Sequence, residues 1–202
     1  MIINIGSRTD IPAFYSDWFY NRIKEGFVYV RNPYYKNQVT KYKLNSEVVD
    51  ILVFVTKNPA PMLDRLDEIN DFNQYWQVTI TPYGKDVEKN VPKKEKVIES
   101  FKKLSTKIGK KKIAWRYDPI FISEKYTLKR HIKIFEKMAA ELKEYTDVSI
   151  ISFIDLFEKT KKNFPEVRAV KKEERHKIGK KFVRIADKYD MIIKTCAEGD
   201  EL

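Results

Sequence analysis

Seven short apolar runs, separated by stretches with helical periodicity, constrain the fold of this chain more than any other feature. They are rich in β-branched and aromatic residues and lie at 3–5, 27–30, 51–55, 76–80, 113–115, 148–152 and 191–194. Several are almost continuously apolar, which is typical of strands buried on both faces of a parallel sheet. We therefore expect parallel strands that are covered by helices.

The intervening stretches predict the helices. Apolar residues recur at helical spacing over 97–108, 128–142 and 178–189, and a further helix is expected to contain Phe14 and Trp18 and to end at Gly26. A shorter helix is expected after Pro59, and 34–44 is expected to be an irregular or hairpin-like insertion. Strands that alternate with helices indicate right-handed βαβ units.

The strand count and the chain length together indicate the fold class. Seven candidate strands, and the lack of a Gly-rich nucleotide loop after the first, favour a barrel-type sheet over a doubly wound one. A complete (β/α)₈ barrel normally needs about 250 residues, and this chain has 202. We predict a single α/β domain over residues 1–202 with a parallel (β/α) barrel-type sheet, which is either open or an incomplete TIM-like barrel.

The charge balance leaves two interpretations open. The chain carries 40 Lys and Arg against 29 Asp and Glu, a net charge of +11. This charge can neutralise the phosphates of a nucleic acid, or it can reflect lysines on solvated helix faces. The sequence shows no alternation of basic and aromatic residues of the kind that stacks single-stranded bases. We therefore favour the solvated surface and keep nucleic acid as a possible partner.

Cysteine content and hydropathy bear on the compartment. The one cysteine, Cys196, cannot form an internal disulfide, which suits a reducing compartment. No stretch reaches the roughly 20 apolar residues that cross a bilayer, and the first residues lack a signal-peptide pattern. The expectation is a cytoplasmic protein without a membrane partner. The oligomeric state is not indicated.

Polar residues that follow the apolar runs are the candidate site residues, because parallel strands in α/β folds place ligands beyond their carboxyl ends. We expect these side chains to meet at one mouth and to bind a small anionic or nucleotide-like ligand. The candidate catalytic residues are Asp10, Lys57, Asp118 and Glu198. Asp10, Asp118 and Glu198 are expected to be acid–base or ion-ligating groups, and Lys57 is expected to contact an anion together with Arg8 and Arg116. The candidates for ligand binding are Arg8, Asn32, Asn58, Thr81, Tyr83, Arg116, Tyr117, Ser152 and Asp155. No metal site is predicted.

Structural roles compete with these functional ones. Asp10 stands where a helix N-cap belongs, and Arg116 with Asp118 can form a self-satisfied ion pair on one face of a strand. Tyr117 can be a core aromatic residue. A functional role is favoured for Lys57, because a lysine between a buried strand and an Asn-Pro pair needs a reason to lie there.

Reaction-specific motifs are missing from the sequence. There is no P-loop, no zinc-ligand spacing and no Gly-x-Ser-x-Gly. The two histidines, His131 and His176, fall within predicted helices without ligand spacing, and we interpret both as surface groups. The motifs alone therefore identify no reaction.

Phrases at the strand ends, taken together, resemble a bacterial and archaeal family known as domain of unknown function 1848. They follow one another over nearly the whole chain as SRTDIPAFYSDWF, VRNP, VDILVFVTKNPAPML, TITPYGKDVE, WRYDPI, ISFIDLFEK and TCAE. The resemblance implies a (β/α) barrel related to radical S-adenosylmethionine enzymes and similar in outline to spore photoproduct lyase. It also implies a C-terminal cysteine cluster that holds an iron–sulfur centre.

This sequence departs from the family pattern at two places. Family members mostly read Ser-Arg-Arg-Thr-Asp near the start, and here the phrase is Gly6-Ser7-Arg8-Thr9-Asp10. Cys196 is the only cysteine, whereas a [4Fe–4S] cluster that activates S-adenosylmethionine needs at least three thiolates. The sequence is either a shortened version or one that has lost the centre. We expect no cofactor, and an iron–sulfur cluster with S-adenosylmethionine only if a further segment supplies cysteines.

Three hypotheses follow for the function. The first is an enzyme that binds a small anionic or nucleotide-like ligand at the strand ends, of a lyase or radical-enzyme type. The second is a nucleic-acid-associated protein, for DNA or RNA binding or repair, that uses its basic surface. The third is a remnant that keeps the fold without catalysis.

Overall fold

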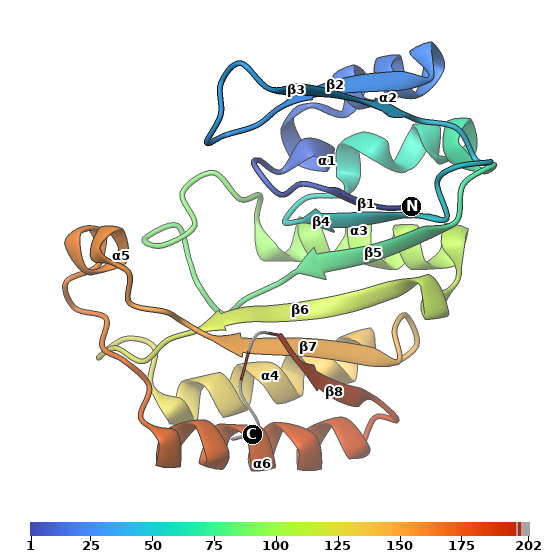
Figure 1. Ribbon diagram of the computed structural model, residues 1–202. Coiled ribbons are helices and arrows are strands. Elements are labelled where there is room, and N and C mark those ends of the chain that lie inside the picture. Colours follow the sequence, from blue (N-terminus) through green and yellow to red (C-terminus); the bar gives the residue numbers. More distant parts are fainter. Residues whose placement is uncertain (197, 199–202) are drawn as a thin grey trace. The chain divides into compact units, whose positions relative to one another are not determined.

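The computed structural model describes residues 1–196 and 198, and its main sheet is parallel (Figure 1). The six strands of this sheet are β1 (Ile2–Ile5), β4 (Ile51–Thr56), β5 (Gln74–Thr79), β6 (Ile113–Ile120), β7 (Val148–Phe153) and β8 (Ile192–Thr195). Their order is β1-β4-β5-β6-β7-β8. The prediction of an α/β fold with a parallel sheet is confirmed, whereas no closed barrel is found within the described residues.

The chain separates into two compact units, of which the first is Met1–Val78 and the second starts at Thr79. The prediction of a single domain over 1–202 stays a prediction. None of the helices in the described part of the chain is long and apolar enough to cross a membrane.

The first unit builds its core on β4. This strand pairs with β1 from Ile2↔Ile51 onward and with β5 from Leu52↔Gln74 onward. Its apolar run buries Phe54, which stacks on Trp76 of β5 at 4.0 Å between ring centroids. The helices of this unit are α1 (Ile11–Phe14), α2 (Ser16–Glu25) and the 3₁₀ segment η1 (Ala60–Ile69).

A separate antiparallel hairpin follows α2. It consists of β2 (Phe27–Arg31) and β3 (Val39–Lys43), paired from Phe27↔Lys43 to Arg31↔Val39. The prediction that 27–30 belongs to the parallel sheet is wrong, and the prediction of a hairpin-like insertion applies instead. The connection between the strands is too short for a parallel crossover, which takes a dozen residues or more, and β3 is exposed along its whole length.

The second unit packs helices against β6, β7 and β8. In these strands Trp115 lies opposite Ser149, and Ile151 lies opposite Thr195. The helices are α3 (Lys94–Ile108), the 3₁₀ segment η2 (Lys110–Lys112), α4 (Leu128–Leu142), α5 (Glu158–Asn163) and α6 (Lys172–Asp187). Helix α6 runs along α4 (Figure 1), and Phe135 stacks on Phe182 at 3.8 Å between centroids. Aromatic stacking therefore joins the two helices to the core.

The interpretation of both histidines as surface groups is wrong for His131, which is 0% exposed. Its Nδ1 lies 2.9 Å from the Tyr117 hydroxyl and its Nε2 lies 2.8 Å from the Phe121 carbonyl. Because a carbonyl only accepts, Nε2 donates and Nδ1 accepts from the tyrosine. Burial lowers the pKa of His131 to about 4. The predicted apolar stripe began at Leu128 and did not include position 131. The buried face of α4 does include it.

Candidate functional site

The carboxyl end of β4 in the first unit is organised around Asp10. Its Oδ1 accepts from the Ala13 backbone N–H at 3.1 Å and from the Thr56 hydroxyl at 2.6 Å, and its Oδ2 accepts from the Lys57 backbone N–H at 2.7 Å. Asp10 is thus the N-cap of α1, which confirms the structural alternative. One carboxylate fixes both the start of α1 and the end of β4.

Asn58 also satisfies backbone groups at this end. Its backbone N–H donates to the Thr56 hydroxyl at 2.9 Å, and its side-chain oxygen accepts from the Ala60 N–H at 3.3 Å. The Lys57 side chain is half-buried. The catalytic roles of Asp10 and Lys57 stay predictions.

Arg8 and Asn32 lie with the hairpin. The Arg8 guanidinium donates to the Arg31 carbonyl at 2.6 Å. The side-chain oxygen of Asn32 accepts from the backbone N–H groups of Tyr34 at 2.9 Å and of Tyr35 at 3.2 Å. Both predicted ligand-binding residues therefore shape the backbone of the hairpin and its turn.

The second unit shows a different arrangement at the ends of β6 and β7. Arg116 and Asp118 are two residues apart on one face of β6, and the Arg116 guanidinium donates to Asp118 Oδ2. The Ser152 hydroxyl, from β7, donates to Asp118 Oδ1. The ion pair is mostly buried, with side chains 17% and 13% exposed, and the Cys196 sulfur lies 4.0 Å from Arg116 Nη2. Side chains here bind one another, and the charge of Arg116 balances that of Asp118.

A depression of about 690 Å³ opens beside this network. Asp118 and Ser152 form part of its wall, together with Asp155, Lys159 and the 69% exposed Phe157. Its volume lies within the range of roughly 300–1,000 Å³ that is usual for small-molecule sites. The depression therefore combines polar groups at strand ends with an accessible aromatic ring.

Sequence reasoning missed Phe157 and Lys159. The segment that carries them, LFEKTKKN, follows the apolar run of β7. It shows no apolar residues at helical spacing, because α5 is too short for that periodicity. Phe157 is an aromatic residue just outside a short polar helix, and both residues lie in the family phrase ISFIDLFEK, to which no site role was assigned.

The Glu198 carboxylate is hydrogen-bonded to the end of β7 and to the Arg175 side chain. Its Oε1 accepts from the Phe153 backbone N–H at 2.6 Å, and its Oε2 accepts from Arg175 Nη1 at 2.9 Å. The Glu198 side chain is 6% exposed, and the Arg175 guanidinium lies 5.3 Å from the Phe153 ring centroid. Glu198 thus fixes the end of β7, and its catalytic role stays a prediction.

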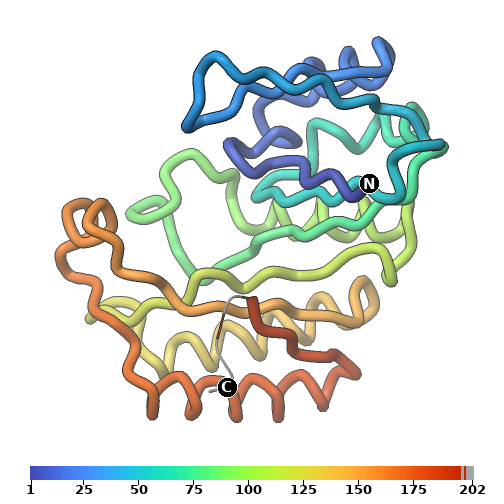
Figure 2. Tube along the Cα trace, in the orientation of Figure 1, coloured from blue at the N-terminus to red at the C-terminus, as the bar shows by residue number. Residues whose placement is uncertain are grey.

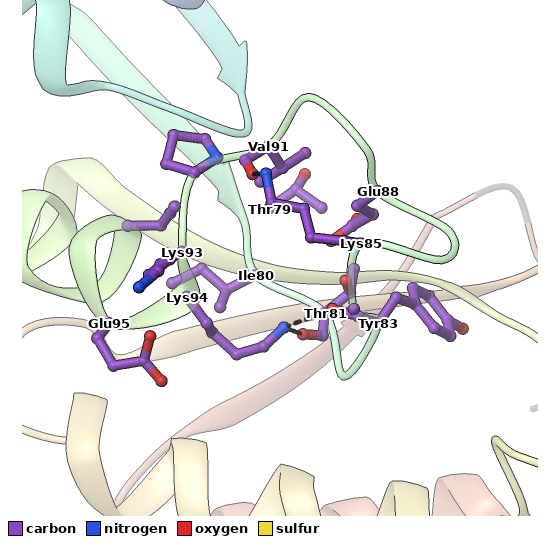
Figure 3. A pocket seen from close by; sticks show the side chains of 13 residues that line it. Thr79, Ile80, Thr81, Tyr83, Lys85, Glu88, Val91, Lys93, Lys94 and Glu95 are labelled. Atoms are coloured by element: carbon purple, nitrogen blue, oxygen red, sulfur yellow. Dashed lines mark hydrogen bonds between the residues drawn. The ribbon is translucent and has the colours of Figure 1, made fainter.

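A smaller cavity of about 180 Å³ contains Thr81 and Tyr83 in its lining (Figure 3). The Lys94 ammonium donates to the carbonyls of both residues, at 3.0 Å in the case of Tyr83. The Lys85 ammonium donates to the carbonyls of Lys89 at 2.9 Å and Val91 at 2.6 Å. These lysines hold the loop after β5 in shape.

Tyr83 and Tyr117 are core residues. The Tyr83 ring stacks on Phe121 at 4.3 Å, and its hydroxyl donates to the Pro119 carbonyl at 2.7 Å. Tyr117 is 1% exposed and bonds to His131. Burial raises the pKa of both tyrosine hydroxyls well above its usual value. The core alternative for Tyr117 is therefore confirmed.

The described residues do not fit the cofactor that the resemblance implies. No group of three or more His, Cys, Asp or Glu within residues 1–196 and 198 is arranged to hold a metal ion. The sequence has one cysteine, and iron–sulfur clusters that activate S-adenosylmethionine need three thiolates.

A family model described as "Domain of unknown function (DUF1848)" matches residues 2–202 of this sequence. The comparisons with curated proteins and with solved structures gave no match. The resemblance that was stated from the strand-end phrases is thereby confirmed.

Proposed function

The chain belongs to the DUF1848 family, and from that premise we propose that its second unit binds a small nucleotide-like ligand, with a flat ring and an anionic group, for an enzymatic reaction. The proposed site is the depression at the carboxyl ends of β6 and β7. The observation that carries the proposal is the Arg116–Asp118–Ser152 network at the wall of this depression.

The lining supports a ligand with both a ring and polar groups. Phe157 offers an exposed aromatic face on which a flat ring can stack. Lys159 provides a positive charge for an anionic group, and Asp155 can accept hydrogen bonds from ligand hydroxyl or amino groups. A purely apolar ligand that covered these charged groups would remove their water without replacing its hydrogen bonds, which is costly.

Asp118 is the proposed acid–base group. It contacts a hydroxyl donor, lines the depression and has its charge balanced by Arg116. A carboxylate held in this way can accept a proton from a ligand hydroxyl positioned beside Ser152. Arg116 lies behind it and acts as a positioning residue.

The experiment is calorimetric titration of the 202-residue chain with adenosine 5′-monophosphate, adenosine and inorganic phosphate. We expect the monophosphate to bind more tightly than either fragment, because it engages the ring wall and the cation together. Phe157→Ala and Lys159→Ala are each expected to weaken binding about tenfold, a loss typical of one stacking or charge-assisted contact.

The matched control is Phe14→Ala in the first unit, which removes another exposed aromatic ring (64% exposed). Its affinity for the monophosphate should equal that of the wild type. Equal losses in Phe14→Ala and Phe157→Ala, or no saturable binding of any of the three probes, would overturn the proposal.

A further inference from the structure

The β2–β3 hairpin carries aromatic rings and positive charges without any acidic residue. From Gly26 to Ser46 the sequence contains Arg31, Lys36, Lys41 and Lys43 and no Asp or Glu. In a chain that is 34% charged, a stretch of this length with cations only is a local concentration of positive charge.

Pairing of the two strands interleaves these cations with aromatic rings. In the hairpin Tyr29 lies opposite Lys41, and Phe27 lies opposite Lys43. The Lys41 ammonium is 4.1 Å from the Phe27 ring centroid and 5.8 Å from that of Tyr29. The interleaving is not evident along the sequence, because each cation and its ring come from opposite strands.

The rings are accessible to a partner. Tyr29 is 61% exposed, and Tyr34 and Tyr35 in the turn are 89% and 71% exposed. Most of the surface of these three tyrosines is open to solvent, whereas Phe27, at the end of β2 away from the turn, is half-buried. Figures 1 and 2 show the hairpin as two adjoining strands with the turn at one end.

The turn that presents two of the tyrosines is held in one shape. Asn32 accepts from the N–H groups of Tyr34 and Tyr35 and donates to the Gln38 side chain at 2.8 Å. The Arg31 guanidinium donates to the Lys36 carbonyl. A fixed turn lowers the entropy that ordering on binding would cost.

The cations of the hairpin form no ion pair with any acidic residue in the described part of the chain. Among the residues that the structure describes, no ion pair involves Arg31, Lys36, Lys41 or Lys43. By contrast, some lysines elsewhere are paired, as Lys188 is with Glu136 at 3.0 Å. The hairpin therefore keeps its positive charge available for an external anion.

We propose that this hairpin surface, made of Tyr29, Arg31, Tyr34, Tyr35, Lys36, Lys41 and Lys43, binds single-stranded nucleic acid. Exposed rings stack on unpaired bases, and interspersed cations neutralise the phosphates between them. An acidic protein partner would satisfy the charges but would leave the exposed rings without a matching feature. The surface lies wholly in the first unit, so the proposal is independent of the ligand site at β6 and β7.

The test is fluorescence anisotropy of the 202-residue chain with a labelled oligothymidine of about 15 nucleotides, a length near the upper site size of single-strand binders. We expect Tyr34→Ala/Tyr35→Ala to weaken binding at least about tenfold, because each stack lost costs about that factor or more. Tyr34→Phe/Tyr35→Phe keeps the rings and should bind like the wild type. Duplex DNA should bind more weakly, because its bases are already stacked.

The charge component is tested with Lys36→Gln/Lys43→Gln against Lys180→Gln/Lys181→Gln, an equal charge change on exposed positions of α6. Each phosphate neutralised on a single strand contributes about 0.7 to the slope of log affinity against log salt. The hairpin pair should lower the slope by about 1.4, and the α6 pair should leave it unchanged.

Phe157→Ala separates this surface from the ligand site and should not change oligonucleotide affinity. Absence of binding at ~0.05 M salt, where such contacts are weakly screened, would overturn the proposal. So would equal effects of the hairpin and α6 variants, or an unchanged affinity in Tyr34→Ala/Tyr35→Ala.

Discussion

The strand ends of the two units carry similar residues that are used differently. At the end of β4 the carboxylate of Asp10 accepts from two backbone N–H groups and one hydroxyl, and Asn58 accepts from another N–H. At the end of β6 the carboxylate of Asp118 accepts from two side chains, those of Arg116 and Ser152, beside a depression. The first arrangement satisfies backbone N–H groups. The second leaves side chains facing a space that a ligand can enter.

This difference shows that a polar residue after an apolar run can have either of two roles. A carboxylate that satisfies backbone groups stabilises the fold and has few lone pairs left for a ligand. A carboxylate that binds only side chains depends less on the backbone and can exchange partners. The position in the sequence is the same in both, so only the bonding pattern separates them.

Asp10→Ala should have the largest effect on stability. It removes three hydrogen bonds to a charged acceptor and a helix cap, and we expect the free energy of unfolding to fall by about 4 kcal/mol. Urea denaturation measures this change. Asp64→Ala, at an exposed position of η1, should change stability by less than about 0.5 kcal/mol. A loss below about 1 kcal/mol in Asp10→Ala would remove the distinction between the two strand ends.

Acid should destabilise the second unit through His131. Burial lowers its folded-state pKa from 6.5 to about 4, so the unfolded chain binds a proton first as the pH falls. The contribution of His131 to stability is therefore fully present above pH 6.5 and is lost between pH 6.5 and 4, by about 3 kcal/mol in total. Urea denaturation across this window measures the slope.

The first unit contains no histidine, so this loss reports on the second unit alone. His131→Gln can still accept from Tyr117 and donate to Phe121, and it should flatten the pH dependence in the window. An equally steep decrease in His131→Gln would show that other groups carry the acid response.

Ser152→Ala should cost about 1 kcal/mol of unfolding free energy, less than the loss of Asp10. It removes one hydrogen bond to Asp118, and water in the depression can replace the lost donor. Ser149→Ala is the control on the same strand, because the Ser149 hydroxyl is buried and has no hydrogen-bond partner among the described residues. That variant should be neutral or slightly stabilising. The opposite order of the two variants, in thermal or urea unfolding, would contradict the network.

Asp155→Ala should give the smallest effect, below about 0.5 kcal/mol of unfolding free energy. Asp155 is exposed and lines the depression, so it is expected to act on the ligand and not on the fold. Calorimetry should show weaker binding of adenosine 5′-monophosphate with an unchanged melting temperature. A marked drop in melting temperature would assign Asp155 to the structure instead.

Much of the fold could be predicted from hydrophobicity. Near-continuous runs such as 51–55 and 148–152 became parallel strands, and Gly26 ended α2 in a left-handed conformation with φ of 74°. The run at 27–30 could not be assigned correctly, because its composition suits either kind of sheet and only its pairing with the polar β3 decides between them. His131 was misplaced because the stripe of α4 was read from the apolar residues alone.

The candidate site was predictable only in part. Position after an apolar run found Arg116, Asp118, Ser152 and Asp155, because parallel strands place their carboxyl ends on one edge. It gave no means to separate these residues from Asp10 or Asn58, whose partners are backbone groups set by tertiary structure. Phe157 precedes and Lys159 belongs to a short helix without periodicity, so hydrophobic patterning did not single them out, and the family phrase ISFIDLFEK contains them without a role.

The most direct test of the contrast between the two strand ends is to map amide chemical shifts of the isotopically labelled chain during titration with adenosine 5′-monophosphate. We predict saturable shifts at 118, 120 and 152–160 in the second unit, with 7–10, 56–58 and 60 in the first unit unchanged. Shifts confined to 7–10, 56–58 and 60 would place the ligand at the end of β4, where the polar side chains bind backbone N–H groups. That result would contradict the account.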